Sequence, residues 1–292
     1  VRDARTHLVV ASGASVGLLA SDRPHLEARR ARPPGSIRRR SSGVDGVRGD
    51  DGDGGGTTTR ALVYDPATGV SEPTGPLVSS DSLGVESAVR LRDGKVLVIG
   101  GALAQIFDPS TLRFTSVGPM IIPRSGASVA LLPDGHVLIA GGYPTGQDAA
   151  TSSAELFDPE TSTFSTTGSL VTSRASAAAA SLPDGRVFVS PGESRMTAEV
   201  YDSTTGTFSV AGTTSQYGSS DIAIALPDGR VVVVKGTGLG GKGVVEMWDP
   251  TSLTFSRSDS LTSRVISATC CGVNSSPARS YPSDSMKPGS AI

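Results

Sequence analysis

The sequence is poor in aromatic residues and contains no long apolar stretch. Aromatic residues make up 4% of the 292 residues, with a single Trp. A hydrophobic core must therefore be built from Val, Leu, Ile and Ala. No run of about 18 apolar residues occurs, which excludes a transmembrane helix. The formal net charge of −2 gives no reason to expect a nucleic-acid partner.

Cysteine is also scarce, because the only two, Cys270 and Cys271, stand next to each other. Neighbouring cysteines rarely bridge each other, since the ring that they would close strains the peptide between them. We interpret them as two small apolar residues of a strand. The sequence thus predicts no disulfide framework, no zinc site and no other metal or cofactor.

Residues 1–56 differ in composition from the rest of the chain. Arginines crowd between residues 23 and 40, and a run of Gly and Asp follows at 49–56. No strand or helix period is visible, so we predict a disordered or low-complexity arm over 1–56. Within it, residues 1–20 weakly resemble a signal peptide. On this ground an extracellular or periplasmic location is slightly favoured over a cytoplasmic one.

From about residue 60 the chain repeats itself with a period of roughly 45 residues. The first recurring feature is an apolar residue, an aromatic residue and Asp, and in the last four copies a Phe follows the Asp. The second recurring feature is an Asp-Gly turn. The aromatic-Asp pairs are Tyr64-Asp65, Phe107-Asp108, Phe157-Asp158, Tyr201-Asp202 and Trp248-Asp249, and the turns are Asp93-Gly94, Asp134-Gly135, Asp184-Gly185 and Asp228-Gly229.

The pattern of each repeat predicts four short antiparallel strands. The Asp-Gly turn joins strands one and two, because Gly accepts the left-handed backbone that a tight hairpin requires. The aromatic-Asp ends strand three, and the Asp-Pro-x-Thr sequence that follows turns the chain into strand four. Four strands per repeat predict an all-β fold, a β-propeller of four-stranded antiparallel blades.

These residues resemble kelch repeats, of the bacterial kind similar to the central domain of galactose oxidase. The matching features are the Gly pairs Gly100-Gly101 and Gly141-Gly142, the aromatic-Asp before a turn, and an aromatic residue in strand four. The family usually carries Trp in strand four, where this chain carries Phe. The resemblance implies kelch-like blades and leaves the function open.

The number of blades is about five by this reading. Repeats at 83–118, 124–168, 174–212 and 217–257 look complete, residues 60–76 supply only strands three and four, and Arg264 to Thr269 fits strand one. If both chain ends share one blade, the ring closes with five, and otherwise it is incomplete. We assign 57–275 to the propeller and 276–292 to a disordered tail. Because both ends lose the repeat, a fragment or a gene with out-of-frame ends is left open.

No catalytic motif is found. The resemblance to galactose oxidase would imply a copper site of His, Tyr and Cys, but the chain has three His residues, two of them in the N-terminal arm. Phosphate loops, nucleophile elbows and paired catalytic carboxylates are absent from the sequence. We therefore expect no enzyme activity.

Binding residues are expected on the face opposite to the short turns, where the connections vary in length. Arg124, Arg174 and Arg264 each precede strand one by the same spacing, and they reach the innermost strand from this face. They could bind a carboxylate or phosphate, or they could hold neighbouring blades together through backbone carbonyls. Tyr143 and Tyr217 flank the same face as candidate contact residues.

Three functional hypotheses follow. The first is a non-enzymatic, monomeric kelch propeller that binds a protein or carbohydrate partner through the loop face. The second is a fragment or inactive relative of a secreted galactose-oxidase-like enzyme. The third is an incomplete, open propeller with no function of its own.

Overall fold

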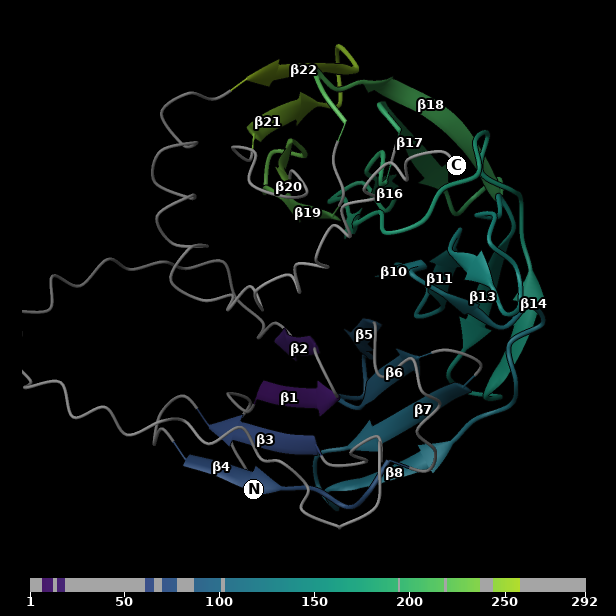
Figure 1. Cartoon of the computed structure of the whole chain (residues 1–292), viewed down its shortest axis with the longest axis vertical. Helices are drawn as coiled ribbons and strands as arrows, with labels where there is room; N and C mark the ends of the chain where they lie inside the picture. Colours follow the sequence, from purple (N-terminus) through teal and green to yellow (C-terminus); the bar gives the residue numbers. More distant parts are fainter. Residues whose placement is uncertain are drawn as a thin grey trace, which may run out of the picture.

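A computed structural model of the chain describes residues 7–12, 15–18, 61–65, 70–77, 87–100, 103–193, 195–217, 220–236 and 244–257. Its regular elements are all strands, and they form five four-stranded antiparallel sheets. The sheets stand side by side in an arc, with one edge strand of each near the centre and the other on the rim (Figure 1). The predicted all-β propeller of four-stranded blades is confirmed.

Four sheets run from the inner to the outer strand in sequence order, as predicted for the complete repeats. The second is β5 (Ser87–Arg90), β6 (Val96–Gly100), β7 (Leu103–Asp108) and β8 (Arg113–Ser116). The third is β10 (Ser128–Leu131), β11 (Val137–Ala140), β13 (Ala154–Asp158) and β14 (Thr163–Thr166). The fourth is β15 (Ala179–Ser181), β16 (Val187–Val189), β17 (Thr197–Asp202) and β18 (Thr207–Thr213). The fifth is β19 (Ser220–Ala225), β20 (Val231–Gly236), β21 (Val244–Asp249) and β22 (Thr254–Arg257).

The first sheet corrects the prediction of an unstructured arm for residues 7–12 and 15–18, and the rest of 1–56 lies outside the described part of the chain. Strands three and four of this sheet are β3 (Ala61–Asp65) and β4 (Val70–Pro73), and its other two are β1 (His7–Ser12) and β2 (Ser15–Leu18). The order is β2-β1-β3-β4, so the N-terminal hairpin enters with its second strand innermost. Two strands thus lie in the segment that resembles a signal peptide. They also take the places that we expected residues from Arg264 onward to fill in a shared blade.

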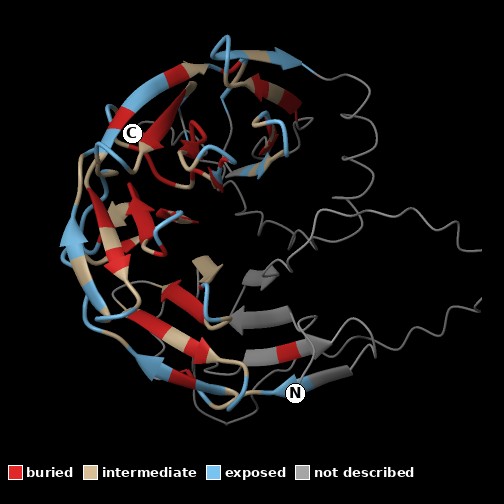
Figure 2. Ribbon diagram, turned by 180° about the vertical axis from the view of Figure 1, so that it is seen from behind, coloured by how far each residue is buried: buried red, intermediate tan, exposed pale blue. Residues whose placement is uncertain are grey.

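The hydrophobic core lies between the sheets, in one layer for each pair of neighbours. Along β11 the residues point alternately to either side: Val137 and Ile139 pack toward the second sheet, and Leu138 and Ala140 toward the fourth. Such alternation is the ordinary geometry of a strand. All four residues are buried, since sheets cover both faces of β11. Figure 2 shows how burial changes across a blade, with buried middle strands, partly buried inner strands and a more exposed outer rim.

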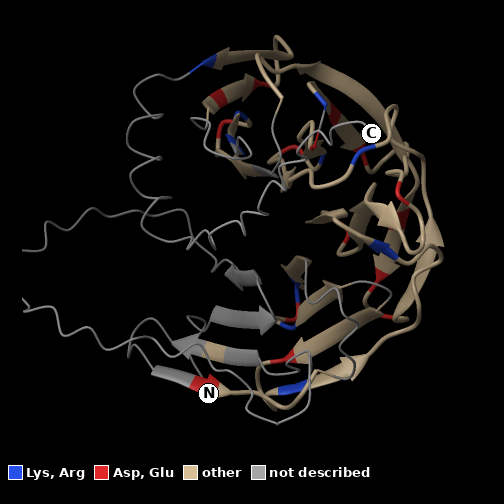
Figure 3. Ribbon diagram, viewed as in Figure 1, with Lys and Arg blue, Asp and Glu red and all other residues tan. Residues whose placement is uncertain are grey.

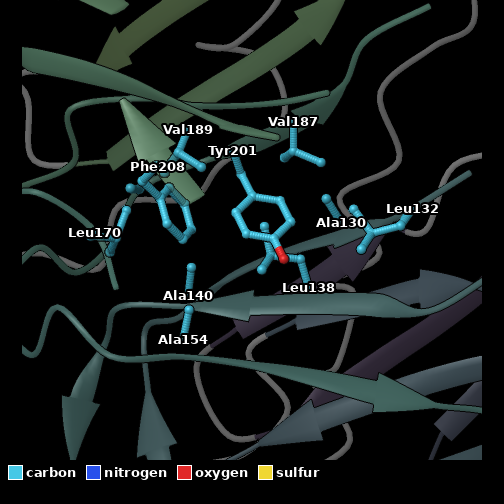
Figure 4. Packing of buried hydrophobic residues seen from close by; sticks show 11 residues of the cluster. Ala130, Leu132, Leu138, Ala140, Ala154, Leu170, Val187, Val189, Tyr201 and Phe208 are labelled. Atoms are coloured by element: carbon cyan, nitrogen blue, oxygen red, sulfur yellow. The ribbon is translucent and has the colours of Figure 1, made fainter. Parts of the chain in front are cut away.

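The layer between the third and fourth sheets illustrates the packing (Figure 4). Leu138 and Ala140 of β11 lie opposite Val187 and Val189 of β16, and the ring of Tyr201 closes the layer. The ring is 1% exposed, and its hydroxyl lies 2.7 Å from Thr167 Oγ1 of the neighbouring sheet. Burial raises the pKa of Tyr201 above its ordinary value. Small residues on the inner strands let the sheets approach where the blades converge.

The aromatic-Asp feature has a structural role in the second to fifth blades. The aromatic residue of strand three pairs directly with the Phe of strand four, as in Phe107 with Phe114, whose ring centroids are 4.9 Å apart. The Asp that follows closes the turn: Asp108 Oδ1 accepts the backbone N–H of Ser110 at 2.8 Å. Equivalent bonds of 2.8 Å are made by Asp158, Asp202 and Asp249. These aspartates act in turns, as their sequence context predicts.

The Asp-Gly turns are equally uniform. Gly135, with a φ of 99°, donates its N–H to Leu132 O at 3.0 Å. Asp134 Oδ1 accepts the N–H of His136 at 3.0 Å. The Asp side chain also faces the charged residue two positions later in several copies. The ion pairs are Asp93–Lys95, Asp184–Arg186 and Asp228–Arg230.

Glycines mark the points where one blade touches the next, a feature that our sequence reading missed on the rim. Gly75 donates its N–H to Leu112 O at 2.7 Å, and Gly168 donates to Gly206 O at 3.0 Å. A Cβ on Gly168 or Gly212 would collide with the carbonyl oxygen of the facing turn. Each of these glycines stands ten residues after the Asp of its repeat, which is a visible sequence signal.

The described sheets do not complete a ring. Figure 1 shows the first and fifth sheets at the two ends of the arc, with no described sheet between them. The inner strands β5, β10, β15 and β19 contact one another in that order. Residues from Arg264 onward, assigned to strand one of a shared blade, lie outside the described part of the chain, as does the predicted tail 276–292.

Replacing Gly141 with Ala is expected to destabilise the protein strongly. The Gly141 φ is 70°, and a Cβ there would collide with the backbone oxygen of Arg174 in the next blade. Gly146 has a similar φ of 78° but nothing within 4 Å of a Cβ, so Gly146→Ala is the matched control. We expect about 1 kcal/mol for the control, from backbone strain alone, and about 2–4 kcal/mol for Gly141→Ala. Chemical unfolding of both variants measures the difference, and equal losses would contradict a close approach of the blades.

Stability is expected to fall in acid because the turn aspartates are stabilised in their charged form. Hydrogen bonds from Ser110, from Thr161 and from the Thr251 N–H lower the pKa of Asp108, Asp158 and Asp249, respectively. A lowered folded-state pKa means that the stabilisation is present above the unfolded-state pKa and is lost as the pH falls through the folded-state value. Between about pH 5 and pH 2 the melting temperature should therefore fall more steeply in the parent than in Asp108→Asn/Asp158→Asn/Asp249→Asn. Parallel melting curves across this range would refute it.

Candidate functional site

The strand order gives the propeller two different faces. Strands one and two meet at the Asp-Gly turns, and strands three and four meet at the Asp-Pro turns, so both short turns lie on one side. We call this side the turn face. The connections from strand two to three and from one blade to the next lie on the other side, the loop face, which includes residues 117–126, 141–153, 167–178, 190–193, 195–196 and 214–217. All five residues that we singled out were expected on the loop face.

Arg124 is buried under the loop face with its donors occupied. Its side chain is 0% exposed. Nη1 donates to the carbonyls of Gly141 and Ser153, at 3.1 and 2.7 Å, and Nη2 donates to Glu155 Oε1 at 2.6 Å. Nε donates to Ile122 O at 3.0 Å. Burial lowers the pKa of Arg124, and the Glu155 carboxylate opposes that shift.

Arg174 repeats this arrangement one blade further on. Its guanidinium forms a close ion pair with Glu199, and both side chains are 0% exposed. Nη1 donates to the carbonyls of Ser190 and Thr197 at 2.9 and 2.6 Å. Glu199 in turn accepts the backbone N–H groups of Val171 and Thr172 at 2.8 and 3.0 Å.

These contacts support the structural interpretation of the arginines over ligand binding. Each guanidinium ties strand one to the ends of strands two and three of its own blade, and the paired Glu fixes the incoming loop. Burying such a charge is tolerable only when it is paired and hydrogen-bonded, and here it is both. No oxygen or nitrogen of Arg124 or Arg174 faces solvent for a ligand to reach. Arg264 lies outside the described residues.

The Glu partners were missed by sequence reasoning, although the sequence carries a signal for them. Glu155 and Glu199 stand three residues before the Asp of their repeats, in the two described blades that have the Arg. The second blade has Gln105 at this position and Leu83 in place of the Arg. In the second blade, therefore, neither member of the Arg–Glu pair is present.

The fifth blade keeps the Glu and changes the cation. Glu246 is 1% exposed and accepts the N–H of Ser215 at 2.9 Å, but Gly218 stands in place of the Arg. Lys235, at the end of β20, is 0% exposed, and its ammonium donates to Thr214 Oγ1 at 3.1 Å. A buried positive charge is therefore retained in this blade, on a different strand.

The two tyrosines occupy different environments on the loop face. Tyr143 is half-buried at the inner end of the third blade, where β12 (Tyr143–Pro144) pairs with β9 (Arg124–Ser125). Its hydroxyl donates to Glu193 Oε2 of the fourth blade at 3.1 Å. Burial, followed by this bond, raises the pKa of Tyr143. Tyr217 is 62% exposed. The structure brings Tyr143 together with Glu193, which the sequence did not indicate, and leaves Tyr217 open to solvent.

Exposed aliphatic residues complete the surface. Ile121 and Val171 occupy equivalent positions, since the N–H of each donates to the buried Glu of its own blade. Their side chains are nevertheless 50% and 59% exposed. The backbone is therefore fixed from below while the apolar side chain faces outward. The sequence alone gave no reason to select them.

Charges are dispersed over the described blades, where acidic and basic residues neighbour one another (Figure 3). Within the described part of the chain, no group of three or more His, Cys, Asp or Glu is arranged to hold a metal ion. His136, the described histidine of the turn face, lies beside Asp134 at 3.1 Å. The described residues also include no helix suited to crossing a membrane. Among the described residues of the loop face, the exposed large hydrophobic side chains are those of Ile121, Val171 and Tyr217.

Comparisons with known proteins support the fold and give no family. No family of known proteins matches the sequence, and the search of curated proteins gives no match either. Among solved structures, the chain is similar to that of YjhT, with a TM-score of 0.50 and 14% sequence identity. The similarity covers 60% of this chain and 65% of YjhT. At this identity it shows the propeller fold alone.

Replacing Arg174 with Met is expected to destabilise the fold by about 3–5 kcal/mol, because the buried carboxyl group of Glu199 would lose its ion-pair partner. Arg174→Met/Glu199→Gln should lose less, since no buried charge is left. Arg195→Met is the matched control: Arg195 is exposed, and its substitution should change the unfolding free energy by about 0.5 kcal/mol or less. Urea unfolding measures all three. An Arg174→Met variant as stable as the control would favour a role in ligand binding instead.

Proposed function

We propose that this chain is a kelch-type β-propeller that binds a protein or a carbohydrate through its loop face and catalyses no reaction. The observation that carries the proposal is the exposure of Ile121, Val171 and Tyr217 on one face of the molecule, at 50%, 59% and 62%. Large apolar side chains that stay exposed on a rigid scaffold are typical of contact surfaces. A propeller supports such a role, because its blades hold the loops in fixed positions.

The contrast between the two faces points to the same surface. The turn face carries the exposed ion pairs of the Asp-Gly turns, such as Asp184–Arg186 and Asp228–Arg230. Charged residues are depleted from the cores of protein interfaces, whereas aromatic residues are enriched. Three exposed apolar or aromatic side chains, those of Ile121, Val171 and Tyr217, lie on the loop face, and Tyr143 and Glu193 add a hydrogen-bonded polar pair. A carbohydrate or a peptide could use the apolar groups for packing and the pair for hydrogen bonds.

The kelch assignment rests on the recurring residues and on their places in the structure. The aromatic-Asp closes strand three, and the Gly at the end of strand two approaches the next blade, as Gly141 does toward Arg174. Both features belong to the architecture and are compatible with many functions. The specific partner must therefore be sought with a binding screen.

Screening against a glycan array and a phage-displayed peptide library tests the proposal. Binders selected on the parent protein are then measured on a loop-face variant, Ile121→Asp/Val171→Asp/Tyr217→Ser, and on a turn-face control, Arg186→Ser/Arg230→Ser. We expect the loop-face variant to lose at least about tenfold in affinity and the control to retain it. Binders that are weakened by the turn-face changes alone would refute the proposal.

A second candidate is an inactive relative or fragment of a galactose-oxidase-like enzyme. A measurement of bound copper distinguishes it from the binding module. Copper chemistry of that kind needs several His, Tyr and Cys ligands in one place. Purified protein incubated with copper(II) and then dialysed is analysed for bound metal. Stoichiometric copper would favour the enzyme-derived candidate, and sub-stoichiometric copper with specific glycan or peptide binding would favour the binding module.

A further inference from the structure

The fifth blade presents an apolar sheet face that no described element covers. Ala223 and Ala225 of β19 pack against the fourth blade. Because side chains alternate along a strand, Ile222 and Ile224 point to the other side, where each is 54% exposed. Val232 and Val234 of the neighbouring strand β20 share this side and are partly buried. We call this surface, formed by Ile222, Ile224, Val232 and Val234, the open face.

In the other blades the corresponding surface is an interface. Ile224 corresponds to Ala130 of the third blade and Ala180 of the fourth, which are 4% and 7% exposed. Ile222 corresponds to Ser128, whose hydroxyl donates to Ala177 O of the following inner strand at 2.8 Å. The open face thus has the position of a surface that is elsewhere covered by the inner strand of the next blade.

We propose that residues 264–271 of this same chain cover the open face as a further inner strand. The spacing supports this occupant. Seven residues separate Arg264 from Arg257, the last residue of β22, whereas eight separate Arg124 from the end of β8 and Arg174 from the end of β14. The connection is one residue shorter than in those blades, but seven extended residues still span about 23 Å, more than the roughly 14 Å across four strands.

The residue types of the segment also fit the face. In register with Arg174, the residues that would point toward the fifth blade are Ser267, Thr269 and Cys271, which correspond to Ala177, Ala179 and Ser181. These side chains are uncharged and short, so the segment can lie against the apolar open face without burying a charge. A backbone hydrogen bond between the blades can form as well. In the third and fourth blades, Gly142 N donates to Arg174 O at 2.8 Å. Gly236 and Arg264 stand at the equivalent positions of the fifth blade and the segment.

The first sheet leaves this segment no place of its own. Strands β2 and β1 already occupy the inner two positions beside β3, so residues 264–271 cannot complete that blade. On the rim, Asp259 replaces the glycine that would stand ten residues after Asp249. The rim glycines serve to admit the strand three-to-four turn of the next blade. An inner strand without such a turn is therefore the occupant that fits both ends of the blade.

Hydrogen–deuterium exchange of the full chain tests the proposal. The amides of 264–271 should exchange at least about tenfold more slowly in the parent than in Ile222→Glu/Ile224→Glu, which charges the open face. Ile121→Glu/Val171→Glu is the control, because it places the same two charges on the loop face and should leave the segment protected. Exchange of 264–271 at the unfolded-chain rate in the parent, or equal protection in the Ile222→Glu/Ile224→Glu variant, would overturn the proposal.

Cross-linking identifies the occupant even if the charged variant fails to fold. In the internal blades, Ser181 Oγ of the fourth blade lies 2.7 Å from Leu131 O of the third. Cys271 stands at the position equivalent to Ser181, and Ala225 at the position equivalent to Leu131. Residue 224, next to Ala225, should therefore lie close to Cys271. In a Cys270→Ser/Ile224→Cys protein, a short bismaleimide should join residues 224 and 271 within one chain, as mass spectrometry of the linked peptides would show. A Cys270→Ser/Val171→Cys protein should give no such link. A covalent dimer would instead identify a second copy as the occupant and refute the proposal, as would the absence of any link to Cys271.

Discussion

The fold depends on one packing constraint: a blade buries both faces of its sheet only when a blade stands on either side. The middle strand β11 shows this directly, because all four of its residues are buried and they divide equally between two neighbouring layers. A single four-stranded sheet of this composition would expose half of its apolar residues. Stability therefore depends on contacts between neighbouring blades, as in other repeat proteins, and a terminal blade leaves one apolar face uncovered unless another element caps it.

The close approach of the blades at the centre explains the buried charges beneath the loop face. Where the inner strands converge, backbone carbonyls at the ends of strands two and three are removed from water and need donors. A guanidinium has enough donors to serve several carbonyls and a carboxylate at once, which is how Arg124 is used. Lys235 of the fifth blade has fewer donors and binds Thr214. The charges of the repeat thus belong to the fold, and the surface above them is left to apolar side chains and Tyr143.

Local features of the sequence predicted the architecture well. The Asp-Gly and Asp-Pro turns depend on a few adjacent residues, so their spacing was enough to place four strands in each repeat. The N-terminal hairpin was missed because it joins the first sheet with its strands in reversed order and far from β3 in the sequence. Its first strand, His7–Ser12, nevertheless resembles the strand that begins at His136. The burial of Arg124 and Arg174 could not be read from spacing, since it is decided by partners on other strands.

The positions that do not follow the repeat are the informative ones for function. Glu155 and Glu199 recur because they hold the loops from below, whereas the residues above them differ: Ile121 and Val171 in two blades, and Ser215 in the next. A fixed backbone with a freely varied outward side chain is the arrangement from which binding surfaces are built. The same reasoning applies at the end of the arc, where Ile222 and Ile224 replace the small residues of the internal interfaces. Both replacements enlarge the apolar surface of this face, so covering it removes more apolar area from water than covering the equivalent surface of an internal blade.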